Sequence, residues 1–320
     1  MDDRTGEDVV VGITGASGFV GSALMRRHID AGDVVRCLTR QSKAISQSGV
    51  QVIEADLERP DNALARFSDG CDVLYHCAGE VRDVRRMQAV NVEGVRALLR
   101  AAAGRIGRWV QLSSVGVYGS SESGLISEDT PLAPRGIYEQ TKADADALVT
   151  EAGRLKDIGS YAVLRPSIVF GPEMPNQSIA QMMRMVQHRL FFYIGRSGAS
   201  ANYVHVSNVA DALLLCGTSP HADGQVYNLS DWCTVEDFVG TIADALGCPR
   251  TRLRLPEWPV RRAVRMINHV ATLPLTDSRV DALVNRSRYS IQRIQRDLKF
   301  SLAVSIPTGL AQMVAMRTAA

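Results

Sequence analysis

A tyrosine and a lysine four residues apart, with a serine upstream, are the side chains in this sequence best suited to proton transfer. Tyr138 and Lys142 would share one face of a helix, because residues with this spacing lie one above the other. A tyrosine hydroxyl has an ordinary pKa near ~10, and a neighbouring ammonium group would stabilise its phenolate form. Ser114 follows the apolar run 109–112, so its hydroxyl could hold a reacting oxygen in line with Tyr138. The pattern predicts acid–base chemistry at a carbonyl or alcohol.

A glycine-rich segment predicts the partner in that chemistry. Residues 14–21 read TGASGFVG and follow the apolar run 9–13, which we interpret as a strand. Gly15 permits a tight turn, Gly18 lets the backbone approach a pyrophosphate, and Gly21 lets the next helix pack on the sheet. The free N–H groups at that helix start would then face an anion. A ligand-free turn is the alternative, but a strand before it and a helix after it favour a dinucleotide site.

The residues after the second and third strands bear on the identity of the dinucleotide. Arg40 ends the second predicted strand, 34–39, and is followed by Gln41, Ser42 and Lys43. A cation and a hydroxyl there suit a ribose 2′-phosphate, whereas NAD-binding folds tend to place an acid at this point. We therefore expect NADP(H), with NAD(H) as the alternative. Asp56 and Leu57 follow the third strand, 50–54, and could border the adenine, although Asp56 could equally cap a helix.

Strand-like and helix-like segments alternate through the first half of the chain, which predicts an α/β fold with a doubly wound parallel sheet of the Rossmann type. After residue 171 the rhythm is interrupted, and we expect a smaller C-terminal substrate domain. The predicted dinucleotide-binding domain is 1–171 plus about 203–217, and the substrate-binding domain is 172–202 plus 218–320. The predicted strands are 9–13, 34–39, 50–54, 73–77, 109–112, 161–165 and 226–229, with a strand followed by a helix in 204–216. The predicted helices are 18–31, 87–103, 138–151, 178–189 and 234–246.

Composition narrows the class of protein. The chain has 320 residues and a formal net charge of +2, which gives no general attraction to nucleic acid. Six scattered cysteines form no metal-ligand pattern, so no metal is expected. No apolar stretch reaches the ~18 residues that span a bilayer, and the polar start lacks a signal-peptide pattern. A cytoplasmic location is the default expectation. Residues 252–275 mix arginines with Trp258 and leucines, and we interpret them as a solvent-exposed helix, with contact to a membrane surface as the alternative.

Taken in order, the motifs resemble those of the extended short-chain dehydrogenase/reductase family, in its NAD-dependent epimerase/dehydratase group. They are TGASGFVG (14–21), LYHCAG (74–79), NVEG (91–94), SSVGVYG (113–119), YEQTK (138–142), LRPSIVFGP (164–172) and YVHVSNVADAL (203–213). The resemblance places Ser114, Tyr138 and Lys142 at the catalytic positions. It further implies cofactor contacts for Ser17, Phe19, Val20, Cys77, Ala78, Gly79, Lys142, Pro166 and Ser167. It also implies a homodimer formed through the helices at 87–103 and 138–151.

The family reaction moves hydride between a substrate carbon and a nicotinamide ring, while the tyrosine exchanges the hydroxyl proton. The resemblance therefore implies an NAD(P)-dependent enzyme, most simply a ketoreductase acting on a nucleotide-sugar. An epimerase with tightly bound cofactor is an alternative. Dehydration is disfavoured, because Val115 and Gly116 stand where dehydratases carry an acid pair.

An apolar, sterol-like alcohol is a further substrate alternative. Residues 199–202 lack the arginine that often holds a sugar diphosphate, and Ile168 and Val169 replace an expected asparagine. Other arginines that could substitute for the missing one are Arg196, Arg286 and Arg288.

Overall fold

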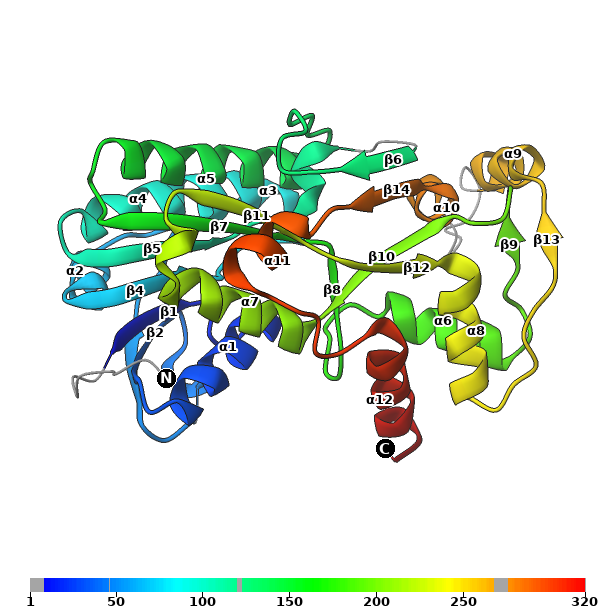
Figure 1. The fold of residues 1–320 in the computed structure, drawn as a ribbon, viewed down its shortest axis with the longest axis horizontal. Coiled ribbons are helices and arrows are strands. Elements are labelled where there is room, and N and C mark those ends of the chain that lie inside the picture. Colours follow the sequence, from blue (N-terminus) through cyan, green and yellow to red (C-terminus); the bar gives the residue numbers. More distant parts are fainter. Residues whose placement is uncertain (1–8, 46, 120–122, 268–275, 320) are drawn as a thin grey trace.

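A seven-stranded parallel sheet forms the larger part of the molecule (Figure 1). The computed structural model describes residues 9–45, 47–119, 123–267 and 276–319. The strand order is β11-β7-β5-β4-β1-β2-β3, and every neighbouring pair is parallel. The strands are β1 (Val10–Thr14), β2 (Val34–Thr39), β3 (Val50–Glu54), β4 (Cys71–His76), β5 (Ile106–Leu112), β7 (Ser160–Pro166) and β11 (Gln225–Leu229). The doubly wound fold predicted from the alternating pattern is confirmed.

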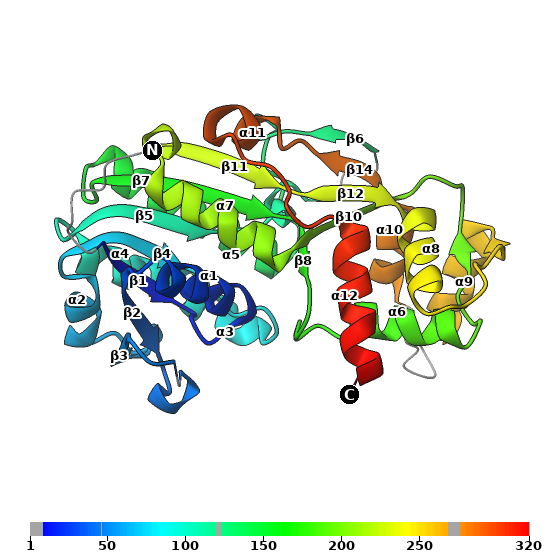
Figure 2. The same cartoon turned by 60° about the horizontal axis from the view of Figure 1, so that its bottom comes forward.

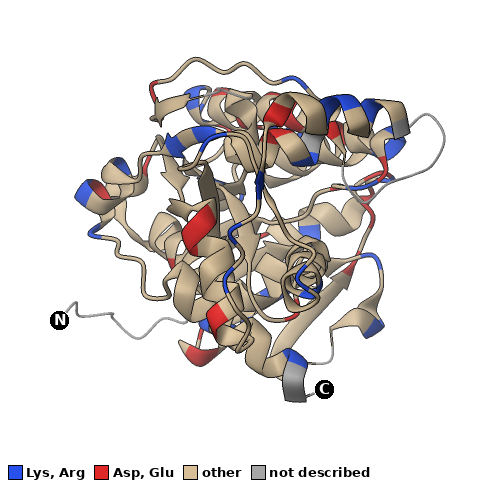
Figure 3. Cartoon of the chain, turned by 90° about the vertical axis from the view of Figure 1, so that its right-hand side faces the viewer, with Lys and Arg blue, Asp and Glu red and all other residues tan. Residues whose placement is uncertain are grey.

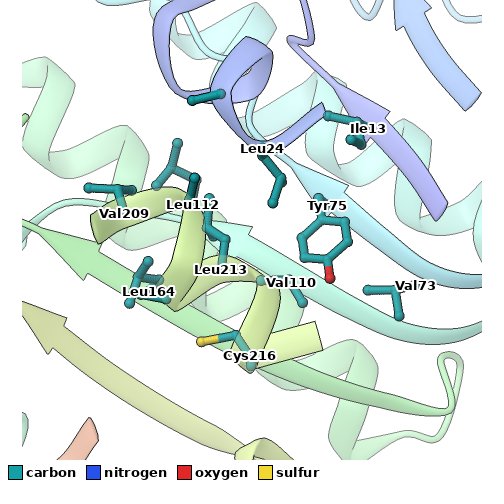
Figure 4. Close-up of a cluster of buried hydrophobic side chains, with 14 of the residues drawn as sticks. Ile13, Leu24, Val73, Tyr75, Val110, Leu112, Leu164, Val209, Leu213 and Cys216 are labelled. Carbon is teal, nitrogen blue, oxygen red and sulfur yellow. The ribbon is translucent and has the colours of Figure 1, made fainter. Parts of the chain in front are cut away.

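Helices cover both faces of this sheet (Figures 1 and 2). On one face lie α1 (Phe19–Asp30) and α7 (Val206–Thr218), and on the other lie α2 (Asn62–Ser68), α4 (Gly94–Ala102) and α5 (Ile137–Arg154). Side chains alternate along each strand between the two cores. Tyr75 packs towards α1 and α7, whereas its neighbour Leu74 packs towards α2 and α4. Figure 4 shows the first of these cores, in which Leu24 and Leu213 meet the strand residues.

The predicted helix 87–103 is divided into three segments. α3 (Val84–Gln88) runs into a π-helical turn (Ala89–Glu93), and α4 follows it. The turn brings Asn91 into the interior, where its side chain is buried. A Cβ on Gly94 would lie 2.9 Å from the Leu57 Cβ, so this glycine allows α4 to pack closely beside the loop after β3.

The smaller region consists of short strands and helices at the other end of the molecule. Its main sheet has the order β12-β10-β8, and two further pairs are β13-β9 and β14-β6. The strands are β6 (Ser123–Ile126), β8 (Ile168–Phe170), β9 (Tyr193–Ile194), β10 (Ser200–His205), β12 (Asp231–Thr234), β13 (Arg254–Leu255) and β14 (Arg286–Tyr289). The helices are α6 (Ser178–Gln187), α8 (Val235–Ala245), α9 (Glu257–Ile267), α10 (Asp277–Val284) and α12 (Ile306–Ala319). Helix α11 (Gln292–Leu298) instead packs on β11 and belongs to the core of the main sheet, although we expected it in the substrate domain. Short 3₁₀ turns also follow β2, β5 and α7, at Ser42–Ala44, Val115–Tyr118 and Pro220–Ala222.

Two segments lie in a different sheet from the one predicted. We expected the strand within 204–216 to join the main sheet, but β10 pairs with β8 and β12 in the smaller region. We assigned 218–320 to the substrate domain, yet β11 extends the main sheet by pairing with β7. The reason is that strand-like patterning gives no information on the pairing partner, which is chosen by long-range packing. The exact domain division stays a prediction.

Other expectations are only partly described by the structure. The basic segment 252–275 includes helix α9, and its residues 268–275 lie outside the described part. Figure 3 faces the end of the molecule that carries α8 and α9, where basic and acidic residues are interspersed. Within the described ranges, no helix is both long enough and apolar enough to cross a bilayer. Dimerisation through α4 and α5 stays a prediction.

Candidate active site

The glycine-rich turn between β1 and α1 closes tightly against the loop that follows β4. Gly15 has a φ of +69°, and a Cβ at this position would lie 2.7 Å from the backbone nitrogen of Ala78. A Cβ on Gly21 would lie only 2.2 Å from the carbonyl oxygen of Gly15. Both the backbone conformation and the contact distance therefore require glycine at 15, and the contact alone requires it at 21.

The amino end of α1 suits an anion. Gly18 is the N-cap, no side chain caps the helix, and its first turn contains no acidic residue. The first N–H groups of a helix have no acceptor within the helix, and the dipole makes this end positive. A pocket of about 370 Å³ lies over this turn. A phosphate or pyrophosphate group fits such a site, and we therefore regard these residues as compatible with a bound dinucleotide.

Most of the predicted cofactor residues line this one pocket. These are Gly15, Ser17, Gly18, Arg40, Asp56, Leu57, Cys77, Ala78 and Gly79. Five others do not line it in the described part of the chain, and one of these, Lys142, is described with the catalytic group below. Phe19 and Val20 belong to the first turn of α1, with side chains packed against the apolar core. Pro166 ends β7, and the buried Ser167 follows it and donates its backbone N–H to the Leu229 carbonyl oxygen at 2.8 Å.

Two arginines line the pocket, where only one was predicted. Arg40 is exposed at the end of β2, and Arg86 reaches the same pocket from α3. Arg86 pairs with Glu58 and lies 3.5 Å from a Glu80 carboxylate oxygen. The hydrogen bond from Arg86 lowers the pKa of Glu58, and the charge of Arg40 adds to this effect. Sequence reasoning missed Arg86 because nothing local distinguishes it from a solvated helix residue. Asp56 accepts a hydrogen bond from the Glu58 N–H at 3.0 Å and so shapes the turn.

The floor of the pocket is fixed by a polar contact between β1 and β4. The Thr14 hydroxyl lies 3.0 Å from Nδ1 of His76 and accepts a hydrogen bond from the Ala78 N–H at 3.1 Å. His76 is buried and its ring stacks on Trp109, with 5.4 Å between the ring centroids. Burial lowers the pKa of His76 to about 3. The histidine is thus a neutral, buried group that packs between β1 and β5.

Ser114, Tyr138 and Lys142 come together at the carboxyl end of β5. Ser114 caps the turn Val115–Tyr118, where its Oγ accepts from the Gly116 N–H at 3.1 Å. The same hydroxyl is hydrogen-bonded to the phenol of Tyr138. Lys142 lies one turn further along α5, buried, and its Nζ donates to the Leu112 carbonyl oxygen at 2.6 Å. A Cβ on the pocket residue Gly79 would lie 3.7 Å from that Nζ, which places the lysine beside the floor of the pocket.

Burial dominates the acid–base properties of Tyr138 and Lys142. Burial raises the pKa of the Tyr138 phenol above its ordinary value; the hydrogen bond with Ser114 opposes this shift and the charge of Asp146 adds to it. Burial also lowers the pKa of Lys142. Burial thus favours the protonated phenol, and the Lys142 ammonium group is hydrogen-bonded to Leu112. The expectation that this ammonium group stabilises the phenolate stays a prediction.

Asn91 links the π-helical turn to this site. Its Nδ2 donates to the Glu80 carbonyl oxygen at 3.0 Å and to the Thr141 hydroxyl at 3.2 Å, and its Oδ1 accepts from the Glu80 N–H at 2.7 Å. The asparagine thus fixes the loop after β4 relative to α5. A π-helical turn often marks a functional position. The helical spacing of 87–103 is continuous, so the sequence did not predict the π-helical turn.

The fold and the pocket together are those of a dinucleotide-binding α/β protein. The model of the NAD-dependent epimerase/dehydratase family matches residues 11–230, which is more than half of the chain. The protein therefore belongs to this family and is an NAD(P)-dependent oxidoreductase or epimerase of the extended short-chain dehydrogenase/reductase type.

Relatives of known name cover almost the whole chain. A 2-alkyl-3-oxoalkanoate reductase from Shewanella oneidensis is 27% identical over 331 residues, spanning 95% of this chain and 85% of the relative. A dTDP-glucose 4,6-dehydratase from Streptomyces griseus is 28% identical over 328 residues, spanning 95% and 92%. Among solved structures, MoeE5 in complex with UDP-glucose and NAD has a TM-score of 0.76 at 22% identity, covering 98% of this chain and all of that one.

Within the described residues, no group of three or more acidic, histidine or cysteine side chains could hold a metal ion.

Proposed function

We propose that this protein is a ketoreductase that uses NADP(H) in preference to NAD(H) to reduce the carbonyl of a nucleotide-linked sugar. The observation that carries the proposal is the convergence of Ser114, Tyr138 and Lys142 beside a pocket built on the glycine turn. A nicotinamide cofactor supplies or accepts hydride when it is bound.

The side chains would divide the remaining chemistry among them. The Ser114 hydroxyl holds the carbonyl oxygen, and the Tyr138 hydroxyl donates the proton that converts the forming alkoxide to an alcohol. The ammonium group of Lys142 stabilises the phenolate left behind. Because burial raises the pKa of Tyr138, the phenol is protonated at neutral pH and ready for the reductive direction. The reverse oxidation needs the phenolate, so its rate should rise with pH into the alkaline range.

The preference for NADP(H) rests on a positive charge in the lining of the pocket. Arg40 is exposed there, whereas Arg86 in the same lining is already paired with Glu58 and Glu80, so Arg40 is the guanidinium group that a ribose 2′-phosphate would meet. Arg40→Gln should lower the ratio of NADPH to NADH efficiency about tenfold, the loss of one surface phosphate contact. An unchanged ratio would remove Arg40 from this role.

Support for a sugar nucleotide comes from the relatives and from one cation. One relative is named for its action on dTDP-glucose, and the MoeE5 structure contains UDP-glucose. Of the three replacement arginines, Arg286 donates to the Ser197 carbonyl oxygen at 2.7 Å, and Arg288 stacks over the Trp232 ring at 3.9 Å. Arg196 is exposed just before β10, and it is the residue that would bind the diphosphate of the substrate.

An apolar ketone is the second candidate, favoured by a different observation. Ile168 begins β8 directly after Ser167 and keeps 48% of its surface exposed. It stands at the sheet edge where open α/β folds bind ligands, and a large exposed aliphatic side chain there would suit an alkyl substrate. The name 2-alkyl-3-oxoalkanoate reductase of the Shewanella relative agrees with such a substrate.

A panel of ketones tests the proposal directly. The purified protein should oxidise NADPH when mixed with a 4-keto sugar nucleotide, measured at the nicotinamide absorbance band. Turnover only with an apolar 3-oxo acid would select the second candidate, and Ile168→Asn should then raise its KM. No turnover with either class would count against reduction.

An epimerase remains the alternative among reactions, and it makes a different prediction. Epimerisation needs two hydride transfers on one retained cofactor, so the purified protein would carry about one equivalent of bound NAD(P). A reductase must exchange its cofactor at each turnover. Extracting the purified protein and measuring the bound nucleotide decides between them.

A further inference from the structure

A buried ion pair lies directly behind the proposed catalytic lysine. Asp146 is one helical turn after Lys142 on α5, and its side chain is 5% exposed. Its Oδ2 accepts from Nε of Arg165 at 3.0 Å and from the Ser113 hydroxyl at 2.9 Å. Its second oxygen, Oδ1, is buried without a hydrogen-bond partner. Burial raises the pKa of this carboxyl, and the charge of Arg165, the hydrogen bonds from Ser113 and Arg165, and the charge of Lys142 oppose the rise.

The pair continues into a chain of hydrogen bonds that ties three elements together. Arg165 on β7 donates to the Tyr118 hydroxyl at 2.9 Å, and that hydroxyl lies 2.9 Å from Oδ1 of Asn228 on β11. The guanidinium group of Arg165 also lies 5.2 Å from the centre of the Tyr118 ring. A rigid, buried network of this kind fixes the position of each member.

Asp146 is hydrogen-bonded to the strand side of the proposed active site and lies on the same face of α5 as Lys142. Ser113, which it binds, stands between Leu112, whose carbonyl oxygen receives the Lys142 ammonium group, and Ser114. On α5 itself, residues 142 and 146 share one face. The carboxylate therefore acts on the lysine through charge and on the end of β5 through a hydrogen bond. A buried ion pair contributes little net stability compared with apolar residues of similar size, so stability alone is a weak reason for its presence.

We propose that Asp146 is a positioning residue, whose carboxylate, oriented by Arg165 and Ser113, holds Lys142 as an ammonium ion at the carboxyl end of β5. The catalytic benefit of this arrangement rests on the proposed function, whereas the effect of Asp146 on the protonation of Lys142 does not. The opposing forces on Lys142 are burial, which lowers its pKa, and the charge of Asp146, which raises it. Arg165 competes for the same carboxylate. The ionisable groups that face Lys142 and Asp146 are Tyr138 on α5, His76 and Cys77 at the end of β4, Arg165 on β7 and Tyr118 in the turn after β5.

The protonation of Lys142 can be measured without any substrate. The sequence contains four lysines, Lys43, Lys142, Lys156 and Lys299, so protein labelled with ¹³C at the lysine ε-carbon gives few signals. Lys142→Arg identifies the signal of interest. In Asp146→Asn we expect its titration midpoint to fall by about one unit or more, because the raising charge is gone. In Arg165→Gln we expect the opposite shift, because Lys142 becomes the nearest cation to the carboxylate.

A matched control separates charge from general disturbance. Asp144→Asn makes the same chemical change two residues away, where Asp144 accepts a hydrogen bond from Gln140 at 2.9 Å near the surface, and it should leave the Lys142 titration unchanged. Shifts of opposite sign in the two network variants support the inference; if one of them does not fold, the sign in the other decides. A Lys142 midpoint that stays at the wild-type value in a folded variant overturns it. Absence of ketone turnover by the wild-type protein would refute the proposed function and leave this result standing.

Discussion

The two ends of the molecule are built by different kinds of contact. In the main sheet, most neighbouring strands are joined by one intervening crossover, and the parallel ladder places the carboxyl ends of β1, β4, β5 and β7 at one edge. In the smaller region, β6 pairs with β14, and their first residues, Ser123 and Arg286, are 163 positions apart in the sequence. Two of its strands, β9 and β13, contain only two residues each. The first end is therefore specified by local signals and the second by long-range assembly.

The difference separates two kinds of function. The glycine turn, the pocket floor and the serine–tyrosine–lysine group belong to the main sheet or its helices. The segments that we assign to the substrate belong to the smaller region or its border. Changes in the main sheet should therefore affect chemistry and cofactor binding, whereas changes in the smaller region should affect substrate affinity. Three predictions test this division, beginning with the largest effect, and a further one on His76 concerns the stability of the main sheet.

Tyr138→Phe removes the proton donor and should lower kcat for ketone reduction by about 1000-fold or more, the upper part of the range for general acid catalysis. The phenyl ring preserves packing, so the dissociation constant for NADPH should change less than threefold, about 0.7 kcal/mol. Stopped-flow reduction and fluorescence titration measure the two quantities. Tyr161→Phe on β7 is the matched control and should leave both at wild-type values. Turnover preserved in Tyr138→Phe would refute the assigned role.

Gly15→Ala should damage cofactor binding, because the added Cβ would lie 2.7 Å from the Ala78 backbone and φ is +69°. Strain of this kind costs about 1–3 kcal/mol, so we expect affinity for NADPH to fall about tenfold to 100-fold. Gly32→Ala is the control: its φ is +83°, but nothing lies within 4 Å of the new Cβ. That variant should lose some stability in thermal denaturation and keep its cofactor affinity. Equal loss of affinity in both variants would show that the positive φ, and not the contact with Ala78, causes the loss of NADPH binding.

The same division explains what could be predicted from the sequence. Strands β2 and β3 were placed at their observed bounds, because short apolar runs between turn residues are local signals. The glycine turn was found for the same reason. The missed features depend on contacts between distant segments. Arg86 of α3 lines the pocket beside residues of the glycine turn and of the β2 end, Asp146 pairs with Arg165 across a helix–strand interface, and β10 joins β8 instead of the main sheet. No spacing within one segment carries this information.

His76 should make the stability of the main sheet depend on pH. Its pKa is about 3 in the folded protein, against ~6.5 when unfolded. The unfolded state therefore binds more protons between these values, so stability is complete above pH ~6.5 and is lost as pH falls towards 3, by up to ~1.4 kcal/mol per unit. His76→Asn should flatten this part of the curve in urea denaturation at pH 4.5–7. His188→Gln, at an exposed position, should retain the wild-type slope; an unchanged slope in His76→Asn would mean that other groups cause the acid loss.

Arg196→Gln provides the smallest effect and tests the smaller region by itself. Arg196 is exposed between β9 and β10, so its contact with a diphosphate would be partly screened by water and worth about 1 kcal/mol. We expect KM for a 4-keto sugar nucleotide to rise about fivefold, while kcat and NADPH affinity stay within experimental error. The increase should shrink at high salt, because screening weakens an exposed charge pair. Arg189→Gln, an exposed change of the same charge in the same region, is the control. If Arg196→Gln instead lowered kcat with KM unchanged, the smaller region would act on the chemical step, and the division between the two ends of the molecule would fail.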